Sequence, residues 1–140
     1  MNVQDLFETK HFPTTKDYSL ANDGDGFVVP GSSFLASIST SEPIRYIAVL
    51  QFKQGEKHAN HYHKKKLEHL LVLDGTLEVD LFPVNNPSDF IKVKIVGSEM
   101  LTIRPECHHT VVSRTETATA LELSPQKLDL TDQFRFNKLD

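Results

Sequence analysis

The chain has 140 residues, a single cysteine (Cys107) and a formal net charge of −4. This length predicts one domain, residues 1–140, with enough chain to bury a sizeable core. The weakly acidic balance gives no electrostatic reason to bind nucleic acid or an anionic membrane, and one cysteine excludes an intrachain disulfide.

The N-terminal half begins without a targeting signal. No basic segment precedes a long apolar run, and no stretch approaches the roughly 20 apolar residues of a membrane helix, so we expect a cytoplasmic protein. Residues 1–26 are polar, contain a turn-rich patch at residues 22–26 and are expected to flank the domain. A short strand is predicted at residues 34–38. Residues 44–53 then alternate between an apolar and a mixed face, which is the period-two pattern of a strand.

The second half predicts a succession of short strands. Residues 70–73 are apolar on both faces and should be buried on both, and Gly75 turns the chain into the next strand. Residues 125–140 are expected to flank the domain, with room for one short helix. Many short strands, frequent turns and no long helical period predict an all-β sandwich or barrel. The further predicted strands are residues 76–82, 90–96, 100–103, 110–113 and 118–123.

Metal-binding chemistry is indicated by the segment between residues 55 and 75. His61 and His63 are separated by one residue, and such residues point to the same face of an extended strand, so both imidazoles can bind one metal ion. Glu68 follows at the start of a strand-like run, and a histidine within residues 103–112 could complete the site. Three imidazoles and one carboxylate suit zinc, iron, nickel or manganese and leave coordination positions open for catalysis.

These residues resemble the first cupin motif. Its defining positions and spacings are matched by Gly55, His61, His63, Glu68 and Gly75.

The second cupin motif is resembled in type and order by Gly97, Pro105 and His109, although Glu106 stands where a turn glycine is common and Ser113 replaces a frequent asparagine. The resemblance implies a double-stranded β-helix, the cupin jelly-roll barrel. It also implies one divalent metal ion (Zn, Fe, Ni or Mn) held by four ligands, which are His61, His63, Glu68 and His109.

Residues 60–69 are also similar to sugar-tailoring and polysaccharide-biosynthesis cupins, including the dTDP-4-dehydrorhamnose 3,5-epimerase-like and dTDP-sugar ketoisomerase-like groups. This likeness favours an isomerase or epimerase acting on a carbohydrate or nucleotide sugar, in which a metal polarises a carbonyl and a histidine or carboxylate moves the proton. Without a metal, His61 or His109 would be the base. The alternatives are a metal-dependent dioxygenase and a non-enzymatic small-ligand sensor.

Other polar residues near the motifs have two interpretations each. His58 is predicted either to touch substrate at the rim of the site or to be a solvated loop residue. Lys64, in the run of residues 64–66, is either a point charge for a substrate phosphate or solvated. His108 should face away from His109 and be partly exposed, and Cys107 is expected to be a turn residue.

Strand parity also bears on assembly. If Glu68 points inward, Leu70 points inward as well, whereas Leu71 and Leu73 point outward and need a cover. That cover is either the N-terminal segment or a second subunit. The resemblance to cupins, which often pair through such sheets, favours a homodimer.

Overall fold

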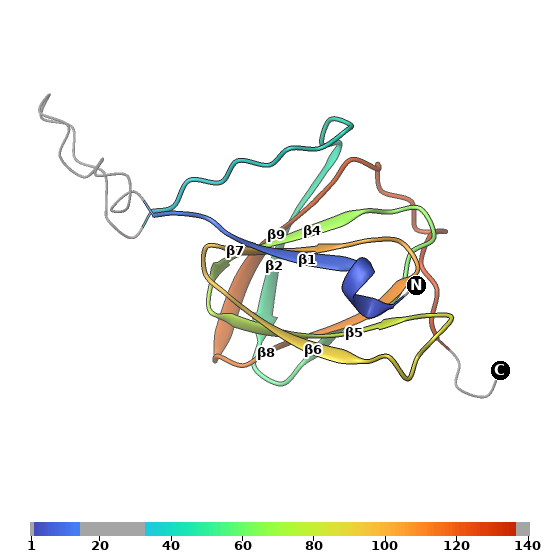
Figure 1. The fold of residues 1–140 in the computed structure, drawn as a ribbon. Helices are drawn as coiled ribbons and strands as arrows, with labels where there is room; N and C mark the ends of the chain where they lie inside the picture. The colour runs from blue at the N-terminus through green and yellow to red at the C-terminus, as the bar shows by residue number, and fades with distance from the viewer. Residues whose placement is uncertain (1, 15–32, 137–140) are drawn as a thin grey trace, which may run out of the picture.

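Two antiparallel sheets pack across a shared apolar core in the computed structural model, which describes residues 2–14 and 33–136 (Figure 1). The five-stranded sheet has the order β1-β7-β4-β9-β2 and the four-stranded sheet the order β3-β8-β5-β6. The predicted all-β jelly-roll barrel of the cupin type is confirmed. The elements are η1 (Val3–Asp5), β1 (Phe7–His11), β2 (Tyr46–Lys53), β3 (Lys57–His61), β4 (Glu68–Asp74), β5 (Thr76–Pro83), β6 (Ile91–Val96), β7 (Glu99–Ile103), β8 (Cys107–Ser113) and β9 (Thr117–Ser124).

The core follows from the alternation of side chains along the strands. On β5, Leu77, Val79 and Leu81 are fully buried, and half-buried residues stand between them. On β4, Leu70 points into the same core, as the parity argument predicted, and Val72 does so as well. Burial of these apolar side chains is the main source of stability, at roughly 25 cal/mol for each Å² removed from water. Among the described residues, no helix is long and apolar enough to cross a bilayer.

The outer face of β4 is partly covered by the protein's own N-terminal region. Leu71 is buried and packs in a small cluster with Phe12 and Met100, to which Phe34 and Ile38 add partly buried contacts. The N-terminal cover that the sequence offered as one alternative is therefore present for Leu71. Leu73 stays 38% exposed.

The structure corrects four expectations about the elements. The segment expected to flank the domain contributes β1, an edge strand that pairs only with β7 and that is too exposed to show an alternating pattern. Residues 35–38 form no strand, because only Phe34 makes a bridge, to Thr14. Strand β2 begins at Tyr46. Residues 125–136 contain no helix, and the patch at residues 22–26 lies outside the described residues.

Candidate functional site

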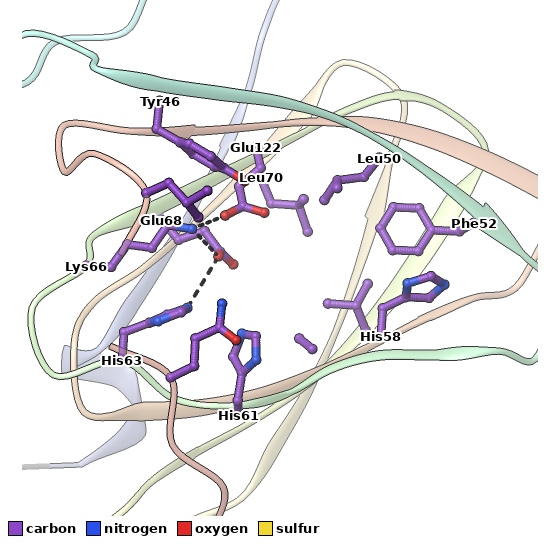
Figure 2. Close-up of a pocket in the computed structure, with 14 residues that line it drawn as sticks. Tyr46, Leu50, Phe52, His58, His61, His63, Lys66, Glu68, Leu70 and Glu122 are labelled. Carbon is purple, nitrogen blue, oxygen red and sulfur yellow. Dashed lines mark hydrogen bonds and ion pairs between the residues drawn. The ribbon is translucent and has the colours of Figure 1, made fainter. Parts of the chain in front are cut away.

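A pocket of about 170 Å³ lies between the two sheets, because strands of both contribute to its walls (Figure 2). Strands β2, β4 and β9 supply one wall, and β3 and β8 supply the other. Two residues of the C-terminal segment complete it. The lining residues are Tyr46, Leu50, Phe52, His58, Ala59, His61, His63, Lys66, Glu68, Leu70, Val111, Glu122, Leu128 and Gln133.

A bulge in β3 brings two histidines into the pocket. His58 and His61 are three residues apart and would point to opposite faces of a regular strand. Ala59 and Asn60 adopt left-handed backbone angles, with φ of 64° and 60°, and the register with β8 shifts at this point. The bulge therefore allows both histidines to line the same pocket.

His63 lies just beyond β3 and joins His61 and His109 in one cluster. The ring centroids of His61 and His63 are 4.6 Å apart, and those of His61 and His109 are 4.9 Å apart. One ligand nitrogen from each of the three rings lies within 4.8 Å of the others. Sequence reasoning placed His61 and His63 on one continuous strand, whereas the structure brings them together across the end of β3.

The turn before β8 is tied directly to His63. Glu106 occupies the position where a glycine is common in the second motif, and it adopts a left-handed φ of 66°. Its backbone N–H donates to the carbonyl of His63 at 2.7 Å. This contact links the residues that precede His109 to the loop that contains His63.

Hydrogen bonds fix the tautomers of His63 and His109. Their Nδ1 atoms lie 2.5 Å from the carbonyl oxygen of Asp132 and 3.1 Å from that of Cys107, respectively. A carbonyl oxygen only accepts, so each Nδ1 must hold the proton and each Nε2 presents a lone pair. Both Nε2 atoms are buried and have no hydrogen-bond partner among the described residues.

These lone pairs face the carboxyl of Glu68. His109 Nε2 lies 3.4 Å from one oxygen, and His63 Nε2 lies 3.8 Å from the other. Burial, and next the charge of Glu122, raise the pKa of Glu68 to about 8. Burial and the two lone pairs that face it favour the protonated carboxyl, so the raised pKa makes this the main form at neutral pH in the absence of a metal ion.

Lys66 lies between Glu68 and Glu122, as Figure 2 shows. Its Nζ is 3.6 Å from Glu68, forms an ion pair with Glu122 and lies over the ring of Tyr46. Burial alone would lower the pKa of Lys66, but Glu68 and Glu122 raise it above its ordinary value. The pocket therefore combines a cation, two acidic groups and a phenol.

The imidazoles of His61, His63 and His109 are neutral at pH 7. Burial, and next the neighbouring His63, lower the pKa of His61 to about 4. Burial also lowers the pKa of His63 and that of His109, the latter well below its usual range. Neutral imidazoles can accept a proton or bind a metal ion.

The residues present fit a divalent metal ion. The unpartnered Nε2 atoms of His63 and His109 and the carboxylate of Glu68 form an N/O donor set, and carbonyl hydrogen bonds to the opposite ring nitrogens are usual for metal-binding histidines. Two zinc ligands are at most about 4.2 Å apart. The ligand nitrogens of the three histidines lie within 4.8 Å of one another, which is close to this range.

The remaining predicted residues are placed as follows. His58 lines the pocket. Lys64 lies outside the pocket, with its ammonium group 4.3 Å from the centre of the Phe134 ring. His108 was expected to be partly exposed, but it is buried because it stacks on Phe82. Cys107 is no turn residue: it is the fully buried first residue of β8.

Sequence reasoning missed four polar residues of the pocket region, one of which is Gln133 of the C-terminal segment. Glu122 shares strand parity with the buried Ala118 and Ala120, and this alternation would have placed its carboxylate inside the barrel. Tyr46 belongs to the face of β2 that was read as apolar. Lys66 was considered only as part of a lysine run, and no local signal separated it from its neighbours.

No protein-family model matches the sequence, and no curated protein matches it. Solved structures do resemble the fold. One is a variant of the 3,4-ketoisomerase QdtA from Thermoanaerobacterium thermosaccharolyticum in complex with TDP-4-keto-6-deoxyglucose, with a TM-score of 0.70, 18% sequence identity and coverage of 92% of this chain and 86% of that one.

Two further solved structures are similar. A 3,4-ketoisomerase from Helicobacter canadensis has a TM-score of 0.70 at 16% identity, over 92% of this chain and 90% of that one. ChmJ, a 3'-monoepimerase from Streptomyces bikiniensis in complex with dTDP-quinovose, has a TM-score of 0.62 at 15% identity, over 70% of this chain and 54% of that one. The structural neighbours are thus sugar-tailoring enzymes with a cupin-like fold.

Proposed function

We propose that the protein is an isomerase or epimerase that acts on a nucleotide sugar at a carbon next to a carbonyl. The observation that supports this proposal best is the neutral His61 in a pocket that also contains a cation and a phenol. These are the groups that proton transfer next to a carbonyl requires. Structural neighbours bound to TDP-sugars support the substrate class.

His61 is the proposed base. Among the described residues no hydrogen bond orients its side chain, in contrast to His63 and His109. With a pKa of about 4, its imidazole is unprotonated at neutral pH and free to accept a proton. His109 is a less suitable base because it is almost completely buried.

The proposed reaction begins when the C–H bond next to the carbonyl breaks. The proton passes to His61, and the electron pair forms the carbon–carbon double bond of an enediolate. Return of the proton to the former carbonyl carbon, while the neighbouring hydroxyl passes its proton to the former carbonyl oxygen, gives the ketone isomer. Protonation of the original carbon from its opposite face gives the epimer, and the Tyr46 hydroxyl is available as that donor.

Lys66 is the proposed source of positive charge in the pocket. The enediolate oxygen is negative, and an ammonium group in a water-poor site stabilises such charge. Glu68 and Glu122 raise its pKa, so Lys66 stays protonated throughout the reaction. Lys64, which was considered as a point charge for a substrate phosphate, does not line this pocket, whereas Lys66 does.

We also propose one divalent metal ion, with His63, His109 and Glu68 as its main ligands. His61, the fourth ligand that the sequence predicted, lies close to both histidines, but the lone pair that accepts the substrate proton cannot also bind the ion, so His61 is left as the base. Such an ion would supply Lewis-acid polarisation of a carbonyl oxygen. Binding would displace the proton of Glu68, because the cation takes its place between the carboxylate and the two lone pairs.

Incubation with TDP-4-keto-6-deoxyglucose in deuterated water tests the proposal. We expect isomerised or epimerised sugar with deuterium at the carbon that exchanged its proton, measured by NMR. His61→Asn should abolish exchange and turnover, while His11→Asn, at an exposed histidine of β1, should change neither. Full exchange in His61→Asn would rule out His61 as the base.

The other functions predict different outcomes in the same experiment. A dioxygenase would consume oxygen when loaded with Fe²⁺, and a sensor would bind a nucleotide sugar without exchange of deuterium. An oxygen electrode and calorimetry separate these results.

A homodimer is proposed through the outer face of β2 and β9. Ile47 and Val49 are each 65% exposed there, and Val49 pairs with Leu121 beside the covered Leu71. Exposed neighbouring apolar residues commonly mark an interaction site. Light scattering should give twice the chain mass, and Ile47→Lys with Val49→Lys should give a monomer. A wild-type monomer would contradict the proposal.

A further inference from the structure

The C-terminal segment, residues 126–136, is bound to the loop that separates His63 from Glu68. Tyr62 and Phe134 exchange backbone hydrogen bonds of 2.9 and 3.0 Å at one end of this loop. At the other end, the backbone N–H of Leu67 donates to Oε1 of Gln126 at 2.9 Å. The loop between the proposed ligands is therefore held from outside the barrel.

Asp132 contacts this loop at its centre. Its carboxylate accepts three backbone hydrogen bonds, from Lys64 at 2.8 Å, Lys65 at 3.2 Å and Lys66 at 3.1 Å. The residue is only 7% exposed. A carboxylate that accepts several backbone N–H groups is held firmly, and its removal leaves buried donors without a partner.

The same residue contacts the site through its backbone. The carbonyl oxygen of Asp132 accepts the Nδ1 proton of His63 at 2.5 Å. The Nε2 lone pair of His63 is thereby directed at Glu68, and the carboxylate contacts hold the backbone from which Lys66 reaches the same group. Asp132 thus acts on both flanks of Glu68 without lining the pocket.

We propose that Asp132 is a positioning residue that fixes the tautomer of His63 and the place of Lys66. This proposal rests on the proposed metal site for its effect on function. Hydrogen-bond partners of metal-binding histidines typically change metal affinity by roughly 10–100-fold when they are removed. Asp132 contributes twice, because its backbone carbonyl orients the ring while its side chain holds the loop to which that ring belongs.

The test uses Asp132→Ala and Asp132→Asn in the full chain. In Asp132→Asn the amide nitrogen replaces the oxygen that accepts from Lys65 and Lys66, or the oxygen that accepts from Lys64, so at least one contact becomes donor against donor. Asp129→Ala is the matched control, because Asp129 lies in the same segment and is exposed, and its side chain hydrogen-bonds only to Thr131 among the described residues. Its backbone carbonyl, which accepts the N–H of Asp132 at 3.1 Å, is retained in this variant.

Two readouts are needed besides thermal stability. The first is the pair of ¹⁵N chemical shifts of the His63 ring in metal-free protein, which report the tautomer. The second is the dissociation constant for Zn²⁺ measured by calorimetry. Both Asp132 variants should show a mixed tautomer for His63 and bind Zn²⁺ roughly 10–100-fold more weakly. Asp129→Ala should match the wild type in both.

Folded Asp132 variants with a single Nδ1-protonated His63 would overturn the proposal, and would make Asp132 a purely structural clasp even if the melting temperature falls. If Asp132→Ala does not fold, the isosteric Asp132→Asn decides. A wild-type protein that binds neither Zn²⁺ nor Fe²⁺ would contradict the metal proposal. The tautomer of His63 in the metal-free variants would still decide the role of Asp132.

Discussion

Replacement of Glu68 by glutamine is expected to change how the stability of the metal-free protein depends on pH. Burial and the neighbouring Glu122 raise the pKa of Glu68 from 4.5 to about 8. Glutamine keeps the shape of the side chain and removes its ionisation. Each unit of pKa corresponds to about 1.36 kcal/mol, so the difference between the folded and unfolded states sets a ceiling of about 5 kcal/mol above pH 8.

The direction of the effect follows because the pKa of Glu68 is higher in the folded state than in the unfolded state. The contribution of Glu68 is complete below about pH 4.5 and is lost as the pH rises through about 8. The free energy of unfolding of the wild type, relative to Glu68→Gln, should therefore fall by about 3–5 kcal/mol between about pH 5 and 9. Urea denaturation in the presence of a chelator at several pH values measures this difference.

Addition of Zn²⁺ should stabilise the wild type more than Glu68→Gln at neutral pH. The wild type gains stability from a carboxylate ligand, whereas an amide is a poorer ligand, so the variant gains less. Glu116→Gln is the charge-matched control, because Glu116 is exposed and distant from the pocket, and its pH profile should follow the wild type. Parallel profiles for Glu68→Gln and the wild type would refute the argument that Glu68 is a buried neutral acid.

Three further predictions concern the fold and its titrating groups. Gly75→Ala should destabilise the protein by more than Gly55→Ala in urea denaturation. Both positions have a positive φ, which costs an alanine about 1–2 kcal/mol. Only at Gly75 would the new Cβ also lie 2.6 Å from a backbone oxygen. The Cys107 thiol should resist alkylation at neutral pH until the protein unfolds, because burial raises its pKa to about 12; rapid labelling of folded protein would contradict this. The wild type should lose stability relative to His61→Gln as the pH falls from about 6.5 to about 4, because the pKa of His61 is lower in the folded state than in the unfolded state. A difference in stability that stays constant over this range would show that His61 is not buried as a neutral ring.

The sequence predicted the barrel and the cluster of His61, His63, Glu68 and His109 because motif spacing reports local chain geometry. Glycines and ligand residues at fixed intervals specify where the chain turns and which side chains point inward. The predicted backbone geometry was only partly correct, because the bulge at Ala59 and Asn60 leaves no pattern in the sequence. Both residues adopt left-handed backbone angles although neither is a glycine. Metal binding by these residues and the cytoplasmic location stay predictions.

What the sequence could not show depends on contacts between distant parts of the chain. Asp132 is 69 residues from His63, and nothing in the polar tail indicates that its carboxylate meets the lysine run. Strand β1 pairs with β7, which lies about 90 residues later in the chain, and its exposed side chains carry no period. Glu122 is different, because the inward parity of Ala118 and Ala120 was visible in the sequence.

The order of the strands has a consequence for synthesis on the ribosome. Strand β9 lies between β4 and β2, and β2 pairs with no other strand of its sheet. A nascent chain that ends before residue 117 therefore cannot close the five-stranded sheet, although most of its hydrophobic residues are already made. Residues 126–136, which hold the loop beside the pocket, emerge later still. Until residues 117–136 are translated, β2 and β4 lack the strand that joins them and stay open to aggregation, so slow translation of this stretch should increase the need for chaperones.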